Sequence, residues 1–138
     1  MTEYRIRWIP NWVPLWSRAF VFWLPFTDHP WVCIPANRKT DPLRLERTRA
    51  HEIVHVEQWL RFGRWGFLRR YFGSDKMEME AEAFAGSCTW WYQAGHTHVD
   101  QGGTLVPVLT HYAGQLWTYY RHGATRAQCR AAIERYLA

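Results

Sequence analysis

The pentapeptide His51-Glu52-Ile53-Val54-His55 constrains the fold of this 138-residue chain more than any other part of its sequence. On a helix, positions i and i+4 lie on the same face about one turn apart. Two imidazoles placed in this way can bind one metal ion, and neutral imidazole nitrogen is a good zinc ligand. The spacing therefore predicts a metal-binding helix built around His51 and His55.

Signals for a helix surround this motif. Thr40-Asp41-Pro42 places a capping side chain directly before a proline, which suits the first helical position. Gly63 is a natural helix end. The sequence thus predicts a helix from Pro42 to about Phe62. Its apolar side is marked by Ile53, Val56 and Leu60.

Two histidines do not complete such a site, because catalytic zinc sites usually have three protein ligands and one open position. The next predicted helix, about residues 74–94, carries the acidic run Glu78-Met79-Glu80-Ala81-Glu82. The run is also compatible with a solvated acidic face, which the helix dipole favours near an N-terminus. The pattern alone leaves three candidates for a third ligand: Glu78, Glu80 and Glu82.

Taken together, residues 40–85 resemble the gluzincin superfamily of metallopeptidases, in which a His-Glu-x-x-His helix is followed by a helix carrying Glu-x-x-Ala-Asp or a close relative. The resemblance implies that Glu78, 23 positions after His55, is the third zinc ligand. It also implies that Glu82 accepts the second ring N–H of a zinc-bound histidine and orients it. Glu82 stands where the family usually has Asp. Glu80 is the reserve candidate for the third ligand.

The same resemblance implies a zinc-dependent hydrolase, in the first place a peptidase. Zinc polarises the scissile carbonyl and lowers the pKa of a bound water. Glu52 is expected to accept the proton of that water and return it to the leaving amine. A further donor should stabilise the oxyanion. The candidates for this donor are His111 and Tyr112, together with Tyr119, Tyr120, His96 and His98, and no spacing singles one out.

The rest of the sequence predicts an α+β fold. Two short runs rich in aromatic residues, 19–24 and 31–34, flank a turn-like segment and predict a β-hairpin. We expect a small N-terminal antiparallel hairpin or sheet packed on about four helices, a minimal zincin-like arrangement. The expected divisions of a single domain over residues 1–138 are strands and turns at 1–36, metal-binding helices at 42–95, a loop at 96–104 and C-terminal helices at 105–138.

Charge and aromatic content bear on the partners of the chain. The net charge of +5 favours anionic partners, although it does not choose between nucleic acid, phospholipid and acidic protein. Ten tryptophans predict either a core rich in large aromatics or a protein interface. Residues 61–73 mix arginines with aromatics, which suits a plain connector, a protein partner, nucleic acid or a membrane surface.

These features support a second hypothesis, a structural or assembly protein on a zincin scaffold, for example a phage virion component that retains the zinc site. Its partners would be proteins of the assembly, or further copies of the chain bound through an aromatic surface. Three cysteines without a Cys-x-x-Cys pair argue against a disulfide framework and against a thiolate zinc site. We expect no signal peptide and no transmembrane segment, and hence a cytoplasmic or virion location.

Overall fold

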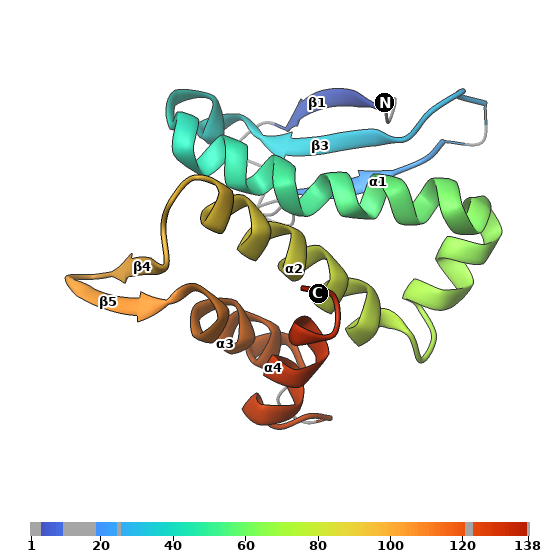
Figure 1. Cartoon of the computed structure of the whole chain (residues 1–138). Coiled ribbons are helices and arrows are strands. Elements are labelled where there is room, and N and C mark those ends of the chain that lie inside the picture. Colours follow the sequence, from blue (N-terminus) through green and yellow to red (C-terminus); the bar gives the residue numbers. More distant parts are fainter. Residues whose placement is uncertain (1–3, 10–18, 25, 121–122, 138) are drawn as a thin grey trace.

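A computed structural model describes residues 4–9, 19–24, 26–120 and 123–137, and the early tryptophans Trp12 and Trp16 lie outside these ranges. The predicted α+β fold is confirmed, with a small N-terminal sheet and four α-helices (Figure 1). The elements in chain order are β1 (Arg5–Ile9), β2 (Phe20–Phe22), β3 (Trp31–Pro35), the 3-10 helix η2 (Ala36–Thr40), α1 (Pro42–Tyr71), α2 (Lys76–Gln93), β4 (His98–Gln101), β5 (Thr104–Pro107), α3 (Val108–Tyr120) and α4 (Arg126–Glu134).

The N-terminal sheet has the strand order β1-β3-β2. The predicted hairpin is confirmed, because β2 pairs with β3 in antiparallel fashion, with Val21 opposite Val32. The sheet as a whole is mixed rather than antiparallel, since β1 pairs with β3 in parallel. Val21, Val32 and Ile34 are buried in a hydrophobic cluster with Val56 and Trp59 of α1. The sheet therefore supports the helix that carries the histidine motif.

Helix α1 begins as predicted, but at Gly63 it is kinked where the sequence predicted its end. The Asp41 side chain accepts a hydrogen bond from the backbone N–H of Arg44, at 3.1 Å, and Pro42 follows the cap. Gly63 has φ 72° and ψ 170°, a left-handed conformation that glycine adopts at little cost. The chain resumes a helix after this kink and continues to Tyr71, which the sequence did not predict.

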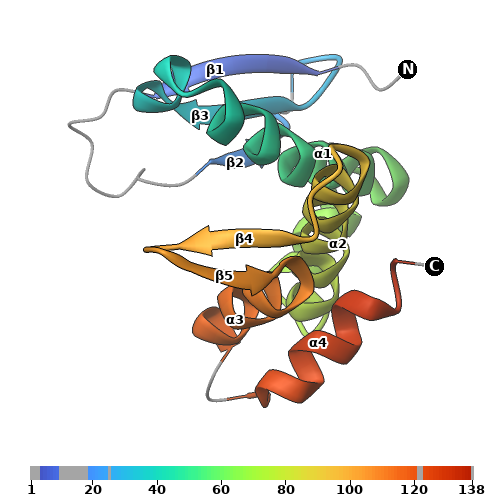
Figure 2. The same ribbon diagram turned by 60° about the vertical axis from the view of Figure 1, so that its left-hand side comes forward.

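Helix α2 lies between two hydrophobic clusters. Its Met79 packs with the sheet and α1, whereas Phe84 and Ala85 pack with α3 and α4. Figure 2 shows the same division, with the sheet on one side of the α1–α2 pair and the β4–β5 hairpin, α3 and α4 on the other. Among the described residues, no helix is both long and apolar enough to cross a membrane.

The C-terminal part differs from the prediction at one point. Residues 96–104 were expected to form a loop, but β4 and β5 form an antiparallel hairpin in which Val99 lies opposite Val106. The turn consists of Gly102 and Gly103, with φ values of 61° and 94°. A Gly-Gly pair between two short strands is a known hairpin signal, because both turn residues need positive φ. Thr125 and Gln128 form a reciprocal capping box at the start of α4.

Gly86 lies at a close approach of α2 to α1. A Cβ atom at this position would lie 2.7 Å from Val54 Cγ2 and 3.1 Å from the Ala50 carbonyl oxygen. We expect Gly86→Ala to lower the free energy of unfolding by about 1–3 kcal/mol, because the branched valine and the backbone oxygen cannot both move away. Chemical denaturation measures the change.

The matched control for Gly86→Ala is Gly114→Ala in α3, where an added Cβ meets nothing within 4 Å. This control should be neutral or stabilising by up to about 1 kcal/mol, since alanine favours helix more than glycine does. Equal stabilities of the two variants would show that the α1–α2 contact is not tight at Gly86.

Candidate metal centre

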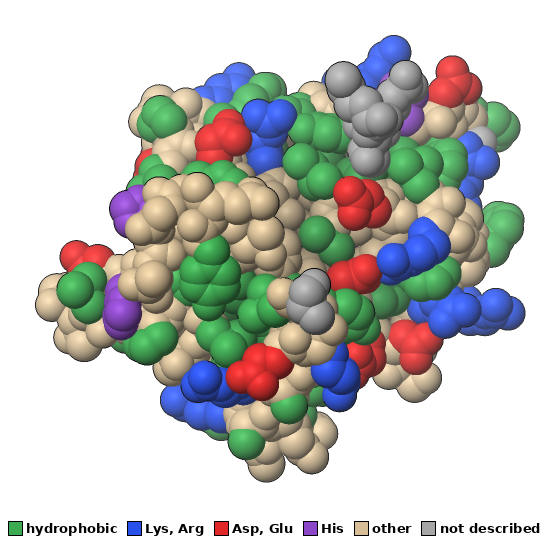
Figure 3. Space-filling view, in the orientation of Figure 1, with side chains coloured by type: hydrophobic (Ala, Val, Ile, Leu, Met, Phe, Trp, Pro, Cys, Tyr) green, Lys and Arg blue, Asp and Glu red, His purple; other side chains and the backbone are tan. Residues whose placement is uncertain are grey.

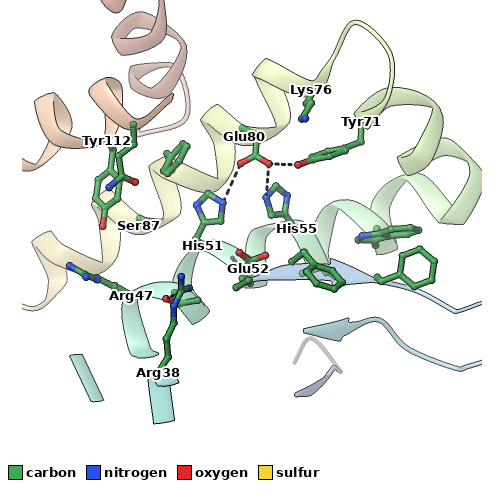
Figure 4. A pocket seen from close by; sticks show the side chains of 18 of the residues that line it. Arg38, Arg47, His51, Glu52, His55, Tyr71, Lys76, Glu80, Ser87 and Tyr112 are labelled. Carbon is green, nitrogen blue, oxygen red and sulfur yellow. Dashed lines mark hydrogen bonds and ion pairs between the residues drawn. The ribbon is translucent and has the colours of Figure 1, made fainter. Parts of the chain in front are cut away.

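The structure brings His51 and His55 of α1 together with Glu80 of α2. Their ligand atoms all lie within 4.8 Å of one another. Nε2 of His51 is 3.3 Å from Oε2 of Glu80, and Nε2 of His55 is 3.3 Å from Oε1 of Glu80 (Figure 4). Ligand atoms at about 2.0–2.1 Å around a tetrahedral ion are separated by about 3.4 Å. The two imidazole–carboxylate separations match this spacing, so the three groups could hold a single ion.

Aromatic neighbours hold the two imidazoles in place. The His51 ring packs edge-on against Phe84, with centroids 4.6 Å apart, and against His55, at 5.0 Å. The His55 ring in turn contacts Phe67 and Tyr71. These contacts restrict the rotation of both rings, so that the ligand nitrogens are already oriented towards Glu80.

A hydrogen-bond chain fixes the tautomer of His55. The Gln58 amide nitrogen donates to the Met79 carbonyl and to Oε2 of Glu82, both at 2.9 Å. Both partners are acceptors only, so the Gln58 oxygen must face His55, whose Nδ1 lies 2.8 Å away. Nδ1 therefore carries a hydrogen, and in the neutral ring Nε2 keeps its lone pair for a metal ion.

The structure brings Glu80 to the two histidines, whereas the sequence-based choice for the third ligand, Glu78, lies elsewhere. The Glu78 carboxylate accepts hydrogen bonds from the Arg135 guanidinium and, at 3.0 Å, from the Tyr136 hydroxyl. Residues two positions apart are separated by about 200° around a helix. When Glu80 faces α1, Glu78 must face away from it, towards the C-terminal end of the chain.

Glu82 supports His55 indirectly, where the resemblance implied a direct contact with a histidine. Its carboxylate accepts from Gln58 and, at 2.7 and 2.8 Å, from the Arg61 guanidinium. Burial acts to raise the pKa of Glu82, but the hydrogen bonds from Arg61 and Gln58 outweigh it and lower the pKa. Glu82 is thus an ionised anchor for Gln58, which is the residue that contacts the imidazole.

The sequence did not identify Tyr71 as part of the site. Its hydroxyl donates to Oε1 of Glu80 at 2.6 Å, so that it orients the third ligand. Tyr71 lies 16 positions after His55, beyond the kink at Gly63, and no periodic pattern crosses a kink. The kink turns the segment 61–73 back over the site. The aromatic residues of this segment were therefore the only hint in the sequence that one of them could belong to the site.

Glu52 is buried beside the two imidazoles, with an exposed fraction of 5%. Burial raises the pKa of its carboxyl group, although the charges of His51 and His55 act in the opposite direction. Within the described part of the chain, its Oε2 is fully buried and has no hydrogen-bond partner. Such an atom is costly unless a bound group or water supplies a donor. A site that holds a metal ion and a water molecule fits this carboxylate.

Comparisons of the chain with protein-family models, curated proteins and solved structures found no match. The site must therefore be interpreted from its own chemistry. Two imidazole nitrogens and one carboxylate oxygen form a donor set that can hold a divalent metal ion. Glu52 is not part of this donor set, and its Oε2 has no hydrogen-bond partner among the described residues.

The site opens into a cavity of about 650 Å³. His111 and Tyr112, the two foremost candidates for an oxyanion donor, both line this cavity. The Tyr112 hydroxyl accepts from the Trp91 indole N–H at 2.8 Å, which leaves its own proton for another acceptor. Nε2 of His111 lies 3.0 Å from the Gln115 amide.

Two further donor candidates, His96 and His98, lie outside this wall. His96 packs against Trp91, and Nδ1 of His98 lies 2.8 Å from the Thr97 hydroxyl. Neither histidine lines the cavity. The side chains of Tyr119 and Tyr120 are outside the described residues.

Metal affinity is expected to depend on pH through His55. In the metal-free protein, burial lowers the pKa of His55, but the charge of Glu80 and the hydrogen bonds with Glu80 and Gln58 outweigh it and raise the pKa to about 9. The pKa of Glu80 is held well below its usual value: burial opposes this, but the charge of His55 and hydrogen bonds from both imidazoles outweigh it. A metal ion at neutral pH must therefore displace a proton from His55, whereas Glu80 is already ionised.

We expect zinc affinity to rise about tenfold per pH unit between pH 7 and 9 because of this proton, and to level off once His55 is neutral. Competition with a chromogenic chelator at several pH values measures the slope. Gln58→Leu should reduce the slope near pH 8–9, because it removes one of the interactions that keep the proton on His55. An affinity independent of pH over this range would contradict the role of His55 as a ligand.

Proposed function

We propose that the chain is a zinc-dependent hydrolase of peptide or amide bonds, in which His51, His55 and Glu80 hold the ion and Glu52 transfers the proton. The observation that carries the proposal is the position of Glu52. Its Oε2 has no hydrogen-bond partner among the described residues, and Glu52 lines the same cavity as His51, His55 and Glu80. A structural metal site needs no such carboxylate, whereas hydrolysis needs a base beside the ion.

The choice of zinc follows from the donor set. Imidazole nitrogen with one carboxylate oxygen is a common set for catalytic zinc, whereas magnesium and calcium prefer oxygen ligands alone. A bound zinc ion polarises a carbonyl group and makes a nearby water more acidic. The residues around it supply the remaining steps.

Glu52 accepts a proton from the attacking water and returns it to the amine that leaves. The raised pKa of Glu52 suits this work, because a base whose pKa lies closer to neutrality can both take and release the proton. Tyr112 and His111 are the wall residues from which a donor to the developing oxyanion would come. Tyr71 keeps Glu80 in position through its hydroxyl.

Metal analysis combined with a peptide library tests the proposal. We expect one zinc ion per chain after reconstitution, and cleavage that disappears on chelation and returns when zinc is added. Apoprotein reloaded with magnesium serves as the control and should remain inactive. Full zinc occupancy without cleavage of any peptide or amide substrate would rule out the hydrolase.

A specific observation also favours the second hypothesis, an assembly protein. Trp65 and Phe72, in and just beyond the part of α1 that follows the kink, have exposed fractions of 79% and 78%. Figure 3 shows hydrophobic side chains next to Lys and Arg side chains at the edge of the molecule formed by this part of α1. Aromatic residues beside arginines are typical of protein interfaces.

The assembly hypothesis makes a separate prediction. A defined oligomer in native mass spectrometry that is lost in a Trp65→Ala variant would support it. A monomer with intact hydrolysis would leave the enzyme as the better explanation. Trp65 is not among the residues that line the cavity of the metal centre, so this variant tests assembly separately from hydrolysis.

A further inference from the structure

The cavity next to the metal centre has two chemically different ends. Aromatic side chains line one end, among them Phe67 and Tyr71 from the part of α1 after the kink and Phe72 just beyond the helix. The other end is lined by arginines at positions 38, 44 and 47 and by polar groups of α3. Figure 4 shows Arg38 and Arg47 on the side of His51, and Tyr71 and Lys76 on the opposite side. The metal ligands lie between the two ends.

Arg44 and Arg47 differ from several other arginines of the described ranges. Both are half-buried, and neither guanidinium has a hydrogen bond or an ion pair with a described residue. Other arginines in the described ranges have carboxylate partners, for example Arg61 with Glu82 and Arg130 with Glu134. A half-buried cation that faces a cavity without an anion is an available site for one.

The charges around this end of the cavity are positive on balance, because three arginines face one carboxylate other than those of Glu52 and Glu80. Glu52 and Glu80 belong to the metal centre, and Oδ1 of the third acidic residue in the cavity wall, Asp100, accepts the backbone N–H of Gly103 at 2.7 Å. The charge of Arg47 adds to burial in lowering the pKa of His111. Arg47 of α1 therefore interacts electrostatically with His111, which belongs to the cavity wall formed by α3.

The position of the two arginines along α1 sets the distance to the reaction centre. Arg47 precedes His51 by four positions and Arg44 precedes it by seven, so they lie about one and two helical turns away on the same face. An extended peptide spans about 3.3–3.6 Å per residue. A carboxylate held by these guanidinium groups would thus lie one to three residues from a bond placed at the metal centre.

We propose that Arg44 and Arg47 form a binding site for a carboxylate of the substrate, so that the cavity selects peptides with a negative charge within three residues of the cleaved bond. The inference rests on the proposed hydrolase function and names its substrate class. A carboxylate can come from an acidic side chain or from a free C-terminus, and both are planar groups that arginine binds through two parallel hydrogen bonds.

The test uses the zinc-loaded Glu52→Gln protein, which should bind peptides without cleaving them. Calorimetry compares a glutamate-containing peptide with its glutamine counterpart, and a free C-terminus with an amidated one. We expect the preferred carboxylate form to bind about tenfold to a hundredfold more tightly than its neutral partner. Arg47→Gln and Arg44→Gln should each reduce this ratio, whereas Arg69→Gln, an exposed arginine outside the cavity wall, should leave it unchanged.

The outcomes separate this inference from the proposed function. If the wild-type protein cleaves peptides but the binding ratio is one, or does not change in Arg47→Gln, the carboxylate site is overturned and the hydrolase stands. If nothing is cleaved but the ratio depends on Arg47, the carboxylate site stands and the hydrolase does not. Absence of both cleavage and binding overturns both.

Discussion

Replacing Glu80 with alanine is expected to lower zinc affinity by more than a hundredfold, whereas replacing Glu78 should leave it nearly unchanged. The expected loss exceeds the roughly 10–100-fold that follows from changes outside the metal's own ligands, because Glu80 supplies one of three ligand atoms. Competition titration with a chelator of known affinity gives both values. The comparison is sharp because the two residues are only two positions apart and carry the same side chain.

Glu78→Ala is the matched control for this experiment. It removes a carboxylate that pairs with Arg135 on the surface of the protein, and exposed ion pairs of this kind contribute about 0–1 kcal/mol to stability. Both variants should therefore remain folded, as circular dichroism can verify. A large loss of zinc affinity in Glu78→Ala, with Glu80→Ala unaffected, would restore the assignment implied by the gluzincin resemblance.

Replacing Glu52 with glutamine is expected to reduce the turnover rate by about 10²–10⁴, because general base catalysis contributes a factor of this size. Zinc content should not change, since Glu52 is not among the ligand groups. The rate is measured on a peptide that the wild-type protein cleaves, with zinc determined on the same samples. Normal turnover in Glu52→Gln would show that another group takes the proton.

The same variant should also be more stable than the wild type when both are metal-free. A buried carboxylate without a partner carries a desolvation cost of about 1–3 kcal/mol, and the neutral amide avoids the cost of the charge. Because the pKa of Glu52 is raised in the folded state, the cost is absent at pH values below the ordinary pKa of 4.5 and grows as the pH rises through the folded-state value. The stability difference between the two proteins should thus be small at acidic pH and largest in alkaline solution.

Local sequence patterns were sufficient to predict the first helix and its two histidines. Asp41, Pro42 and Gly63 each affect the backbone conformation of neighbouring residues, so their effect on the helix can be predicted from local sequence. His51 and His55 are four positions apart, which is about one helical turn. The choice between Glu78 and Glu80 is of a different kind. It depends on the rotation of α2 relative to α1, which is fixed by contacts such as Gly86 against Val54.

Other parts of the fold depend on contacts between distant segments in the same way. β1 pairs in parallel with β3 although β2 lies between them in the chain, and no local pattern encodes this pairing. Tyr71 reaches Glu80 because Gly63 redirects the helix, so its role follows from a turn in three dimensions. The β4–β5 hairpin could have been predicted from its Gly-Gly pair, but the sequence analysis assigned this segment to a loop.

The position of α2 between two hydrophobic clusters affects how firmly the metal centre can retain an ion. Glu80 stands on a helix whose orientation is set from both sides, by Met79 towards the sheet and by Phe84 and Ala85 towards the C-terminal helices. A substitution deep among α3 and α4 can therefore alter ion retention without touching any ligand. Conversely, an ion bound between α1 and α2 would link the part of the molecule that contains the sheet to the part that contains α3 and α4. Release of the ion would then lower the stability of regions far from the ligand residues.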